Sequence, residues 1–246
     1  MSLPEIVTPE EWRAARVELL AREKELTRAR DALSADRRRL PMVEIDTDYS
    51  FTGPAGPASL LDLFGGHRQL IVQHFMFDPD WTDGCPSCTA ACDEISDGLI
   101  EHLHARDTEL VVVARAELPT IEDYRRRRGW TFPWYSSYGS SFNYDFHVTL
   151  DPSVAPVEFN YLTAAELDAR GWGWLNEGTH EQPGYSVFLR DGDRMFHTYS
   201  MFARGTEWLG GSYAFLDTTA LGRQEDWEEP KGRSGSARGA VPNFED

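Results

Sequence analysis

Two short, almost continuous apolar runs stand out along the chain, residues 69–77 (QLIVQHFMF) and residues 109–114 (ELVVVA). Runs of this kind are typical of strands covered on both faces of a parallel sheet. The segment between them opens at Cys85, and its pattern predicts a helix that continues to about residue 105. A strand, a helix and a second strand parallel to the first form a βαβ unit. The pattern therefore predicts an α/β protein.

The first forty residues have a helical pattern instead. Thr8 is a candidate N-cap, Pro9 follows at the first helical position, and Glu11 stands three residues after Thr8, which together predict a helix start. A narrow apolar stripe recurs at helical spacing: Trp12, Ala15, Leu19, Leu26, Ala29 and Leu33. Such a stripe suits a helix laid on a domain surface or against a second subunit. Residues 1–40 are thus predicted to be a helical extension, through which a homo-oligomer is possible.

The remaining pattern completes a predicted domain over residues 41–222. Short strands and turns are expected over residues 43–64, with a helical turn at 59–64. A hairpin is expected around Asp191-Gly192. The other expectations are a helix over 120–129, strands and loops over 130–148, hairpin strands at 184–189 and 195–202, and a helix over 206–220. The polar, Gly-rich residues 223–246 are predicted to be a flexible, disordered tail.

Composition narrows the classes of partner. The 246 residues carry a formal net charge of −17, which opposes binding to nucleic acids and to anionic membranes. No apolar run approaches the roughly 20 residues of a membrane span, and no secretory signal pattern precedes the first helix. A cytoplasmic location is expected. The run Arg125–Arg128 spreads around a helix and is expected to be a solvated face with local ion pairs.

The segment Cys85-Pro86-Ser87-Cys88 follows the first buried strand directly. A cysteine at a helix N-terminus is favoured as the thiolate. Cys85 is therefore the candidate nucleophile and Cys88, one turn inside, the candidate resolving thiol. A CxxC segment in a βαβ unit predicts a thioredoxin-like fold with a central mixed sheet and flanking helices. Asp80 and Asp83 flank this loop and are expected to oppose a lowered thiol pKa.

Several stretches, taken in order, resemble the bacterial proteins grouped as domain of unknown function 899: EKELTRARDAL, RRRLPMV, LIVQHFMFDPDW, GCPSC, GWTFPWYSS, FNYDF, SVFLRDGDRMFHTYSMFARG and LDTTALGRQE. The resemblance covers residues 10–225 and implies a thioredoxin-like fold, distantly similar to peroxiredoxins. It also implies that Cys85 and Cys88 are the redox pair and that Pro183 is the cis-proline facing them. Pro79 and Thr82 stand three residues apart rather than four, so the peroxiredoxin motif before the cysteine is missing.

Two aromatic residues are candidates for contacting a substrate, Trp81 in the loop before Cys85 and Tyr185 just after Pro183. Cys92, four residues after Cys88, is a second resolving thiol, a metal ligand or a buried residue. His74 lies inside the first strand and is expected to be a core histidine. His102 and His104 are two apart, hence on different helix faces, so a metal shared by them is not expected.

Three functions remain open. The first is a thiol–disulfide oxidoreductase, or a peroxide-related reductase, acting on a protein or small-molecule disulfide through Cys85 and Cys88, with no cofactor. The second is a metal-binding or metal-delivery protein that uses Cys85, Cys88 and Cys92 or His180, since thiolates and imidazole suit zinc or copper. The third is a non-catalytic interaction scaffold that docks through the N-terminal helix.

Overall fold

The computed structural model describes residues 3–225 and 227–232. These residues fall into two compact units, residues 42–214 on the one hand, and residues 3–41 with the described residues from 215 onward on the other. The boundaries expected at residues 40/41 and 222/223 remain predictions. Most of the predicted flexible tail, residues 233–246, lies outside the described residues.

Helix α1 (Pro9–Arg37) begins where the sequence predicts. Thr8 and Glu11 form a reciprocal capping box: the Thr8 backbone N–H donates to Glu11 Oε2 (2.9 Å), and the Glu11 N–H donates to Thr8 Oγ1 (3.3 Å). All 29 residues of α1 are described and none is buried. The apolar stripe is exposed, Trp12 by 61% and Leu26 by 55%. Oligomerisation through this stripe remains a prediction.

The centre of the larger unit is an eight-stranded mixed sheet in the order β1-β12-β11-β4-β5-β6-β2-β3. Its strands are β1 (Val43–Glu44), β2 (Ser50–Gly53), β3 (Gly56–Ser59), β4 (Gln69–His74), β5 (Thr108–Ala114), β6 (Trp134–Ser136), β11 (Gly184–Asp191) and β12 (Arg194–Phe202). Strand β4 is parallel to β5 and antiparallel to β11, which is antiparallel to β12. A parallel βαβ unit followed by a hairpin on the other side of its first strand is the thioredoxin-like arrangement, and the predicted fold is confirmed.

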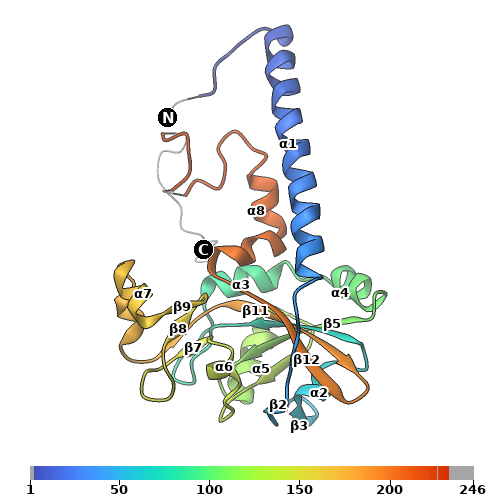
Figure 1. Cartoon of the computed structure of the whole chain (residues 1–246), viewed down its shortest axis with the longest axis vertical. Helices are drawn as coiled ribbons and strands as arrows, with labels where there is room; N and C mark the ends of the chain where they lie inside the picture. The colour runs from blue at the N-terminus through green and yellow to red at the C-terminus, as the bar shows by residue number, and fades with distance from the viewer. Residues whose placement is uncertain (1–2, 226, 233–246) are drawn as a thin grey trace. The chain divides into compact units, whose positions relative to one another are not determined.

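Alternation along β5 separates two apolar cores, because successive side chains of a strand point to opposite faces. Val111 and Val113 belong to one core and Val112 and Ala114 to the other. Helices α2 (Leu60–Leu63), α6 (Phe142–Asp145) and α7 (Ala164–Ala169) contribute to the first core, and α3 (Pro86–Asp93) and α5 (Leu118–Arg128) to the second. Figure 1 shows α3 and α2 on opposite sides of the sheet.

The prediction of a single helix from Cys85 to about residue 105 is wrong. The chain forms α3 and, after a break at residues 94–96, α4 (Asp97–His104). The Ser96 side chain causes the new start by accepting a hydrogen bond from the Leu99 N–H (3.2 Å), as an N-cap does. The last predicted helix is also divided, into a 3₁₀ helix (Ala203–Leu209) and α8 (Gly211–Leu216). The break falls at Gly210, and glycine is a poor helix former.

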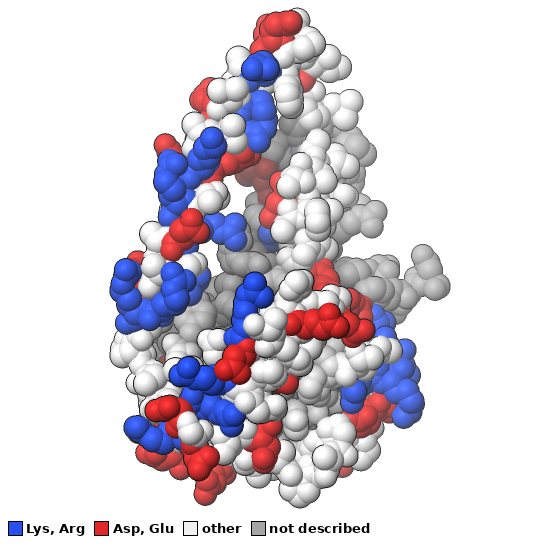
Figure 2. All heavy atoms as spheres, turned by 90° about the vertical axis from the view of Figure 1, so that its right-hand side faces the viewer, with Lys and Arg blue, Asp and Glu red and all other residues white. Residues whose placement is uncertain are grey.

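The remaining short elements are β7 (Thr149–Leu150), β8 (Glu158–Phe159), β9 (Leu162–Thr163), a 3₁₀ helix (Gly173–Asn176) and β10 (His180–Glu181). Strand β10 pairs with β7, and β8 pairs with β9. Within the described residues, no helix has both the length and the apolar character needed to cross a membrane. Figure 2 shows basic and acidic side chains intermixed on one face of the molecule.

Candidate active site

The cysteine segment is held firmly at the carboxyl end of β4. The Cys85 N–H donates to the Met76 carbonyl (3.0 Å). The Cys85 carbonyl accepts from both the N–H and the hydroxyl of Thr89 (2.9 Å each), and Thr89 is hydrogen-bonded to the Tyr124 hydroxyl (2.7 Å). Gly84 is required by close packing, since a Cβ there would stand 2.2 Å from Phe75 Cε1. These contacts fix the Cys85 backbone.

Cys85 is half-buried at the N-cap of α3, and Pro86 occupies the first turn as predicted. Its pKa is lowered to about 6, first because the Cys88 thiol donates a hydrogen bond to its sulfur; the backbone N–H groups of Cys88 and Ser87 act in the same direction, and burial opposes them. Cys88 is buried, and its role as donor together with its burial raises its own pKa well above the usual value. The pair thus holds one thiolate and one protonated thiol.

Asp83 does not act on this thiolate as the sequence reasoning expected. Its carboxylate is paired with Arg127 (Nη1 to Oδ1, 2.8 Å), so its charge is partly neutralised. Asp80 is exposed to solvent, and solvent screens its charge. The two carboxylates were expected to oppose a lowered Cys85 pKa, but neither is among the groups that shift it, and the pKa is lowered.

Cys92 lies fully buried in the core of α3 and α5. Burial raises its pKa well above the ordinary value, the Asp93 charge adds to this, and a hydrogen bond with Gln73 opposes it. A thiol in this state is a poor nucleophile. Of the three roles left open by the sequence, the buried one fits these surroundings.

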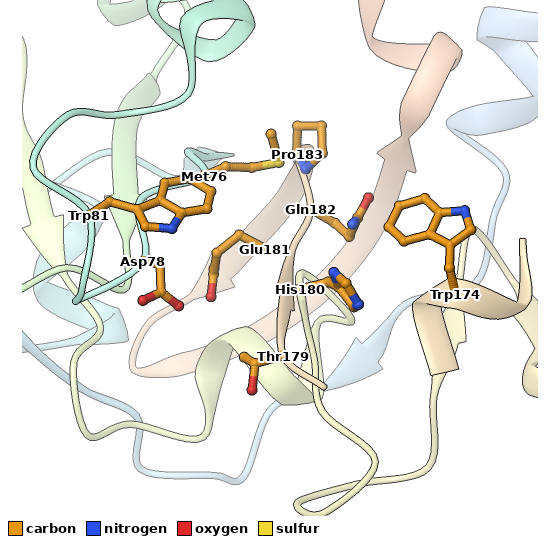
Figure 3. A pocket seen from close by; sticks show the side chains of 9 residues that line it. All are labelled: Met76, Asp78, Trp81, Trp174, Thr179, His180, Glu181, Gln182 and Pro183. Atoms are coloured by element: carbon orange, nitrogen blue, oxygen red, sulfur yellow. The ribbon is translucent and has the colours of Figure 1, made fainter. Parts of the chain in front are cut away.

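A pocket of about 380 Å³ opens beside the cysteine loop (Figure 3). Its lining residues are Met76, Asp78, Trp81, Trp174, Thr179, His180, Glu181, Gln182 and Pro183. Figure 3 shows Trp81 and Trp174 on opposite sides of the pocket, with the Asp78 and Glu181 carboxylates between them. Trp81 and Trp174 are 41% and 57% exposed. One lining residue, Met76, contacts the cysteine segment directly, because its carbonyl accepts a hydrogen bond from the Cys85 N–H.

Pro183 lines this pocket, but the cis bond expected before it is not found. Among the described residues the cis peptide bond is Glu229–Pro230, so Gln182–Pro183 is trans. The chain passes from β10 to β11 without a tight turn, and the Gln182 N–H donates to the Val148 carbonyl (2.8 Å). Such an extended path does not require the cis form, which is found chiefly in turns.

A largely buried ion network at the wall of the pocket could not be predicted from the sequence. Arg115 pairs with Asp78 and, through Nε, with Glu181 Oε1 (2.6 Å). Glu181 also accepts a hydrogen bond from the Thr149 hydroxyl (2.9 Å). It is only 6% exposed, and its pKa is raised by burial, against the lowering effect of Arg115. These residues are far apart in the chain and do not form a motif of regular spacing, so the sequence contains no pattern from which the network could be predicted.

Tyr185 and His180 lie in different surroundings from those expected. Tyr185 does not line the pocket; burial raises its pKa, and Cys92, Cys88 and Glu94 contribute, so it faces the buried side of α3. His180 lines the pocket, and its Nε2 is 2.7 Å from the Glu177 carbonyl. Within the described residues, His180 and the cysteines form no cluster of three metal-ligand atoms.

The run Arg125–Arg128 forms local ion pairs, as expected. Arg125 and Arg126 pair within α5, with Glu122 and Asp123. The next two arginines reach the cysteine segment: Arg127 binds Asp83 before it, and Arg128 binds Asp93 at the end of α3. The second half of the run thus connects α5 to both ends of the cysteine segment.

His74 is a core histidine, as predicted. It is 2% exposed, and its Nε2 is 2.8 Å from Ser186 Oγ. Burial lowers its pKa to about 3, and His197 contributes. The hydrogen bonds continue from Ser186 to Ser200 (2.8 Å) and from Ser200 to His197 Nε2 (2.7 Å). This polar chain joins three neighbouring strands.

Solved structures similar to this chain include redox proteins. The bacterioferritin comigratory protein of Xanthomonas campestris, studied for alkyl peroxide reduction, is 10% identical, with a TM-score of 0.44 over 69% of this chain and 92% of that one. Peroxiredoxin Q of the same organism is 13% identical, with a TM-score of 0.45 over 74% and 98%. A putative protein disulfide isomerase from Bacteroides thetaiotaomicron is 17% identical, with a TM-score of 0.36 over 66% and 82%.

Similarity at these values adds nothing to the fold assignment, which rests on the strand order. No curated protein matches the sequence significantly. The family model described as "Bacterial protein of unknown function (DUF899)" matches residues 1–238. This match spans nearly the whole chain, and the protein therefore belongs to the DUF899 family.

Proposed function

We propose that the protein is a thiol–disulfide oxidoreductase in which Cys85 is the attacking thiol and Cys88 the resolving thiol. One observation carries the proposal: Cys85 is the N-cap of α3 and Cys88 lies in the first turn of the same helix. In this position the Cys88 thiol and the backbone N–H groups of Ser87 and Cys88 lower the Cys85 pKa to about 6. A thiolate is the attacking species in disulfide exchange. At neutral pH, Cys85 is therefore ready to attack while Cys88 keeps its proton.

The reaction proceeds in two exchanges. The Cys85 thiolate attacks one sulfur of a substrate disulfide, which forms a mixed disulfide and releases the other sulfur as a thiolate. That thiolate takes up a proton. Cys88 then loses its proton to solvent and attacks the Cys85 sulfur, which releases the second substrate thiolate and leaves a Cys85–Cys88 disulfide. Two electrons pass to the substrate, and an external dithiol restores the protein.

The pocket beside Met76 and Pro183 is the proposed binding site for the substrate. Trp81 and Trp174 contribute aromatic surfaces to the pocket. Pro183 lines it directly before Gly184, the first residue of β11. A hydroperoxide is a second electrophile that a thiolate attacks. The spacing of Pro79 and Thr82 lacks the peroxiredoxin motif, so the disulfide is the favoured substrate.

The test follows reduction of a chromogenic aromatic disulfide by the prereduced full chain, with a hydroperoxide as a parallel substrate. Cys85→Ser is expected to abolish the reaction, and Cys88→Ser to trap the mixed disulfide, detectable by mass spectrometry. Cys92→Ser is the matched control and should react like wild type. If Cys85→Ser reduces both substrates as fast as wild type, the proposal is wrong.

A further inference from the structure

A second group of potential ligands lies at the far end of the sheet from the thiols. His67 stands in the loop before β4, His104 is the last residue of α4, and Glu109 is the second residue of β5. In the parallel β4–β5 pair, Leu70 faces Glu109 near the start of both strands, whereas Cys85 follows the end of β4. This His–His–Glu cluster is therefore separate from the proposed active site.

The three side chains already converge. One ligand atom from each, a ring nitrogen or a carboxylate oxygen, lies within 4.8 Å of the other two. His104 Nε2 is 3.0 Å from Glu109 Oε1, and the rings of His67 and His104 stack with centroids 4.5 Å apart. Ligands about 2.1 Å from a tetrahedral ion stand about 3.4 Å apart. The His67 and His104 side chains are 24% and 39% exposed and have room to rotate toward that spacing.

The Glu109 carboxylate is already held in a position from which it can bind such an ion. It is only 7% exposed, and its Oε1 accepts a hydrogen bond from the Leu110 N–H (2.9 Å), which fixes the carboxylate. Oε1 also faces His104 Nε2 at 3.0 Å, and buried carboxylates are paired with such groups or coordinate metals. Oε2 faces Gly65, where a Cβ would stand 2.7 Å from it. The missing side chain, at a positive φ of 57°, keeps the space beside Oε2 open.

Asp107 supports the cluster from outside. Its Oδ1 is 3.5 Å from His67 Nδ1 and also accepts the Arg68 N–H (3.0 Å). Carboxylates placed behind an imidazole in this way orient metal-bound histidines and raise their basicity. The cluster thus has both a ligand set and an orienting group.

We propose that His67, His104 and Glu109 bind a divalent first-row transition ion, with Zn²⁺ as the representative. Two imidazoles and one carboxylate suit Zn²⁺, Co²⁺ and Ni²⁺, whereas Ca²⁺ and Mg²⁺ prefer oxygen ligands alone. Three protein ligands leave a further position for water or for a group from a partner. The site differs from the cysteine site considered from the sequence and does not depend on the redox proposal.

The test measures Zn²⁺ affinity of the full chain by competition with a chromophoric chelator, in a Cys85→Ser/Cys88→Ser background that removes thiolate ligands. One Zn²⁺ per chain is expected. His67→Ala, His104→Ala and Glu109→Gln are each expected to weaken binding at least tenfold. His102→Ala is the matched control, since His102 is exposed on the same helix outside the cluster, and its affinity should equal that of the background.

A second readout covers variants that fold poorly. In the Cys85→Ser/Cys88→Ser background, Co²⁺ bound at this site is expected to give a visible spectrum without thiolate charge transfer, and to lose it in His104→Ala, a substitution of an exposed residue. No stoichiometric binding in that background, or equal affinity of His104→Ala and His102→Ala, would overturn the proposal.

Discussion

The lowered pKa of Cys85 gives a quantitative prediction. A pKa of about 6, against 9.0 for an ordinary thiol, makes Cys85 about 90% thiolate at pH 7, where an ordinary thiol is about 1%. The Cys85 thiolate is, however, about 20-fold less nucleophilic than the thiolate of an ordinary cysteine, because nucleophilicity falls as the thiol pKa falls (Brønsted coefficient about 0.45). The net gain in alkylation rate at pH 7 is therefore only about fourfold.

The gain is far larger in acid, where an ordinary thiol is almost fully protonated. At pH 5 the thiolate fraction is about 9% for Cys85 and about 0.01% for an ordinary thiol, so the net gain rises to about 40-fold. The assay is iodoacetamide labelling of the reduced chain from pH 4.5 to 9.5, with each cysteine followed by peptide mass spectrometry. Cys85 is expected to titrate with a midpoint near pH 6, above which the rate is constant.

Two variants separate the causes of this midpoint. Cys88→Ala removes the hydrogen bond that contributes most to the lowered pKa, and it should move the Cys85 midpoint upward by a unit or more. Cys92→Ala removes a buried thiol one turn further along α3 and should leave the midpoint unchanged. A wild-type midpoint at pH 8 or above, or an unchanged midpoint in Cys88→Ala, would refute the reasoning.

Two further predictions concern buried charge. The native pKa of His74 is about 3 and the unfolded value is about 6.5, so between these two pH values the unfolded chain binds a proton at His74 that the folded chain does not. The unfolding free energy should then fall by up to about 1.4 kcal/mol per pH unit in acid. Unfolding free energies measured by urea titration at several pH values should depend less steeply on pH in His74→Gln than in wild type, and should be unchanged in this respect in His102→Gln. Arg115→Met leaves Glu181 buried without its cation and should cost about 3–5 kcal/mol at pH 7 by the same assay, whereas Arg126→Met, at an exposed pair, should cost under about 1 kcal/mol.

Local patterns were sufficient to predict the main elements of the fold. Strands β4 and β5 are continuous apolar runs, the β11–β12 hairpin has an Asp-Gly turn, and Thr8 and Glu11 cap α1. Each of these signals lies within a few neighbouring residues. The position of Cys85 after β4 followed from the same patterns.

The parts that sequence reasoning missed depend on contacts between distant residues. Arg115 meets Asp78 and Glu181 across 37 and 66 positions of the chain. Asp83 lost its expected effect because Arg127, 44 residues away, pairs with it. The trans bond before Pro183 depends on how the chain enters β11, which no local pattern encodes.

The arginine run of α5 has a consequence for how this family can diverge. Arg127 and Arg128 hold the residues on either side of the cysteine segment, Asp83 and Asp93. A substitution of Arg127 or Arg128 therefore removes an ion pair at one end of a segment to which neither residue belongs. Relatives that share an identical cysteine tetrapeptide can thus differ in thiol reactivity through a helix elsewhere in the chain. A comparison of their redox behaviour therefore has to include the residues at positions 127 and 128 as well as the cysteine tetrapeptide.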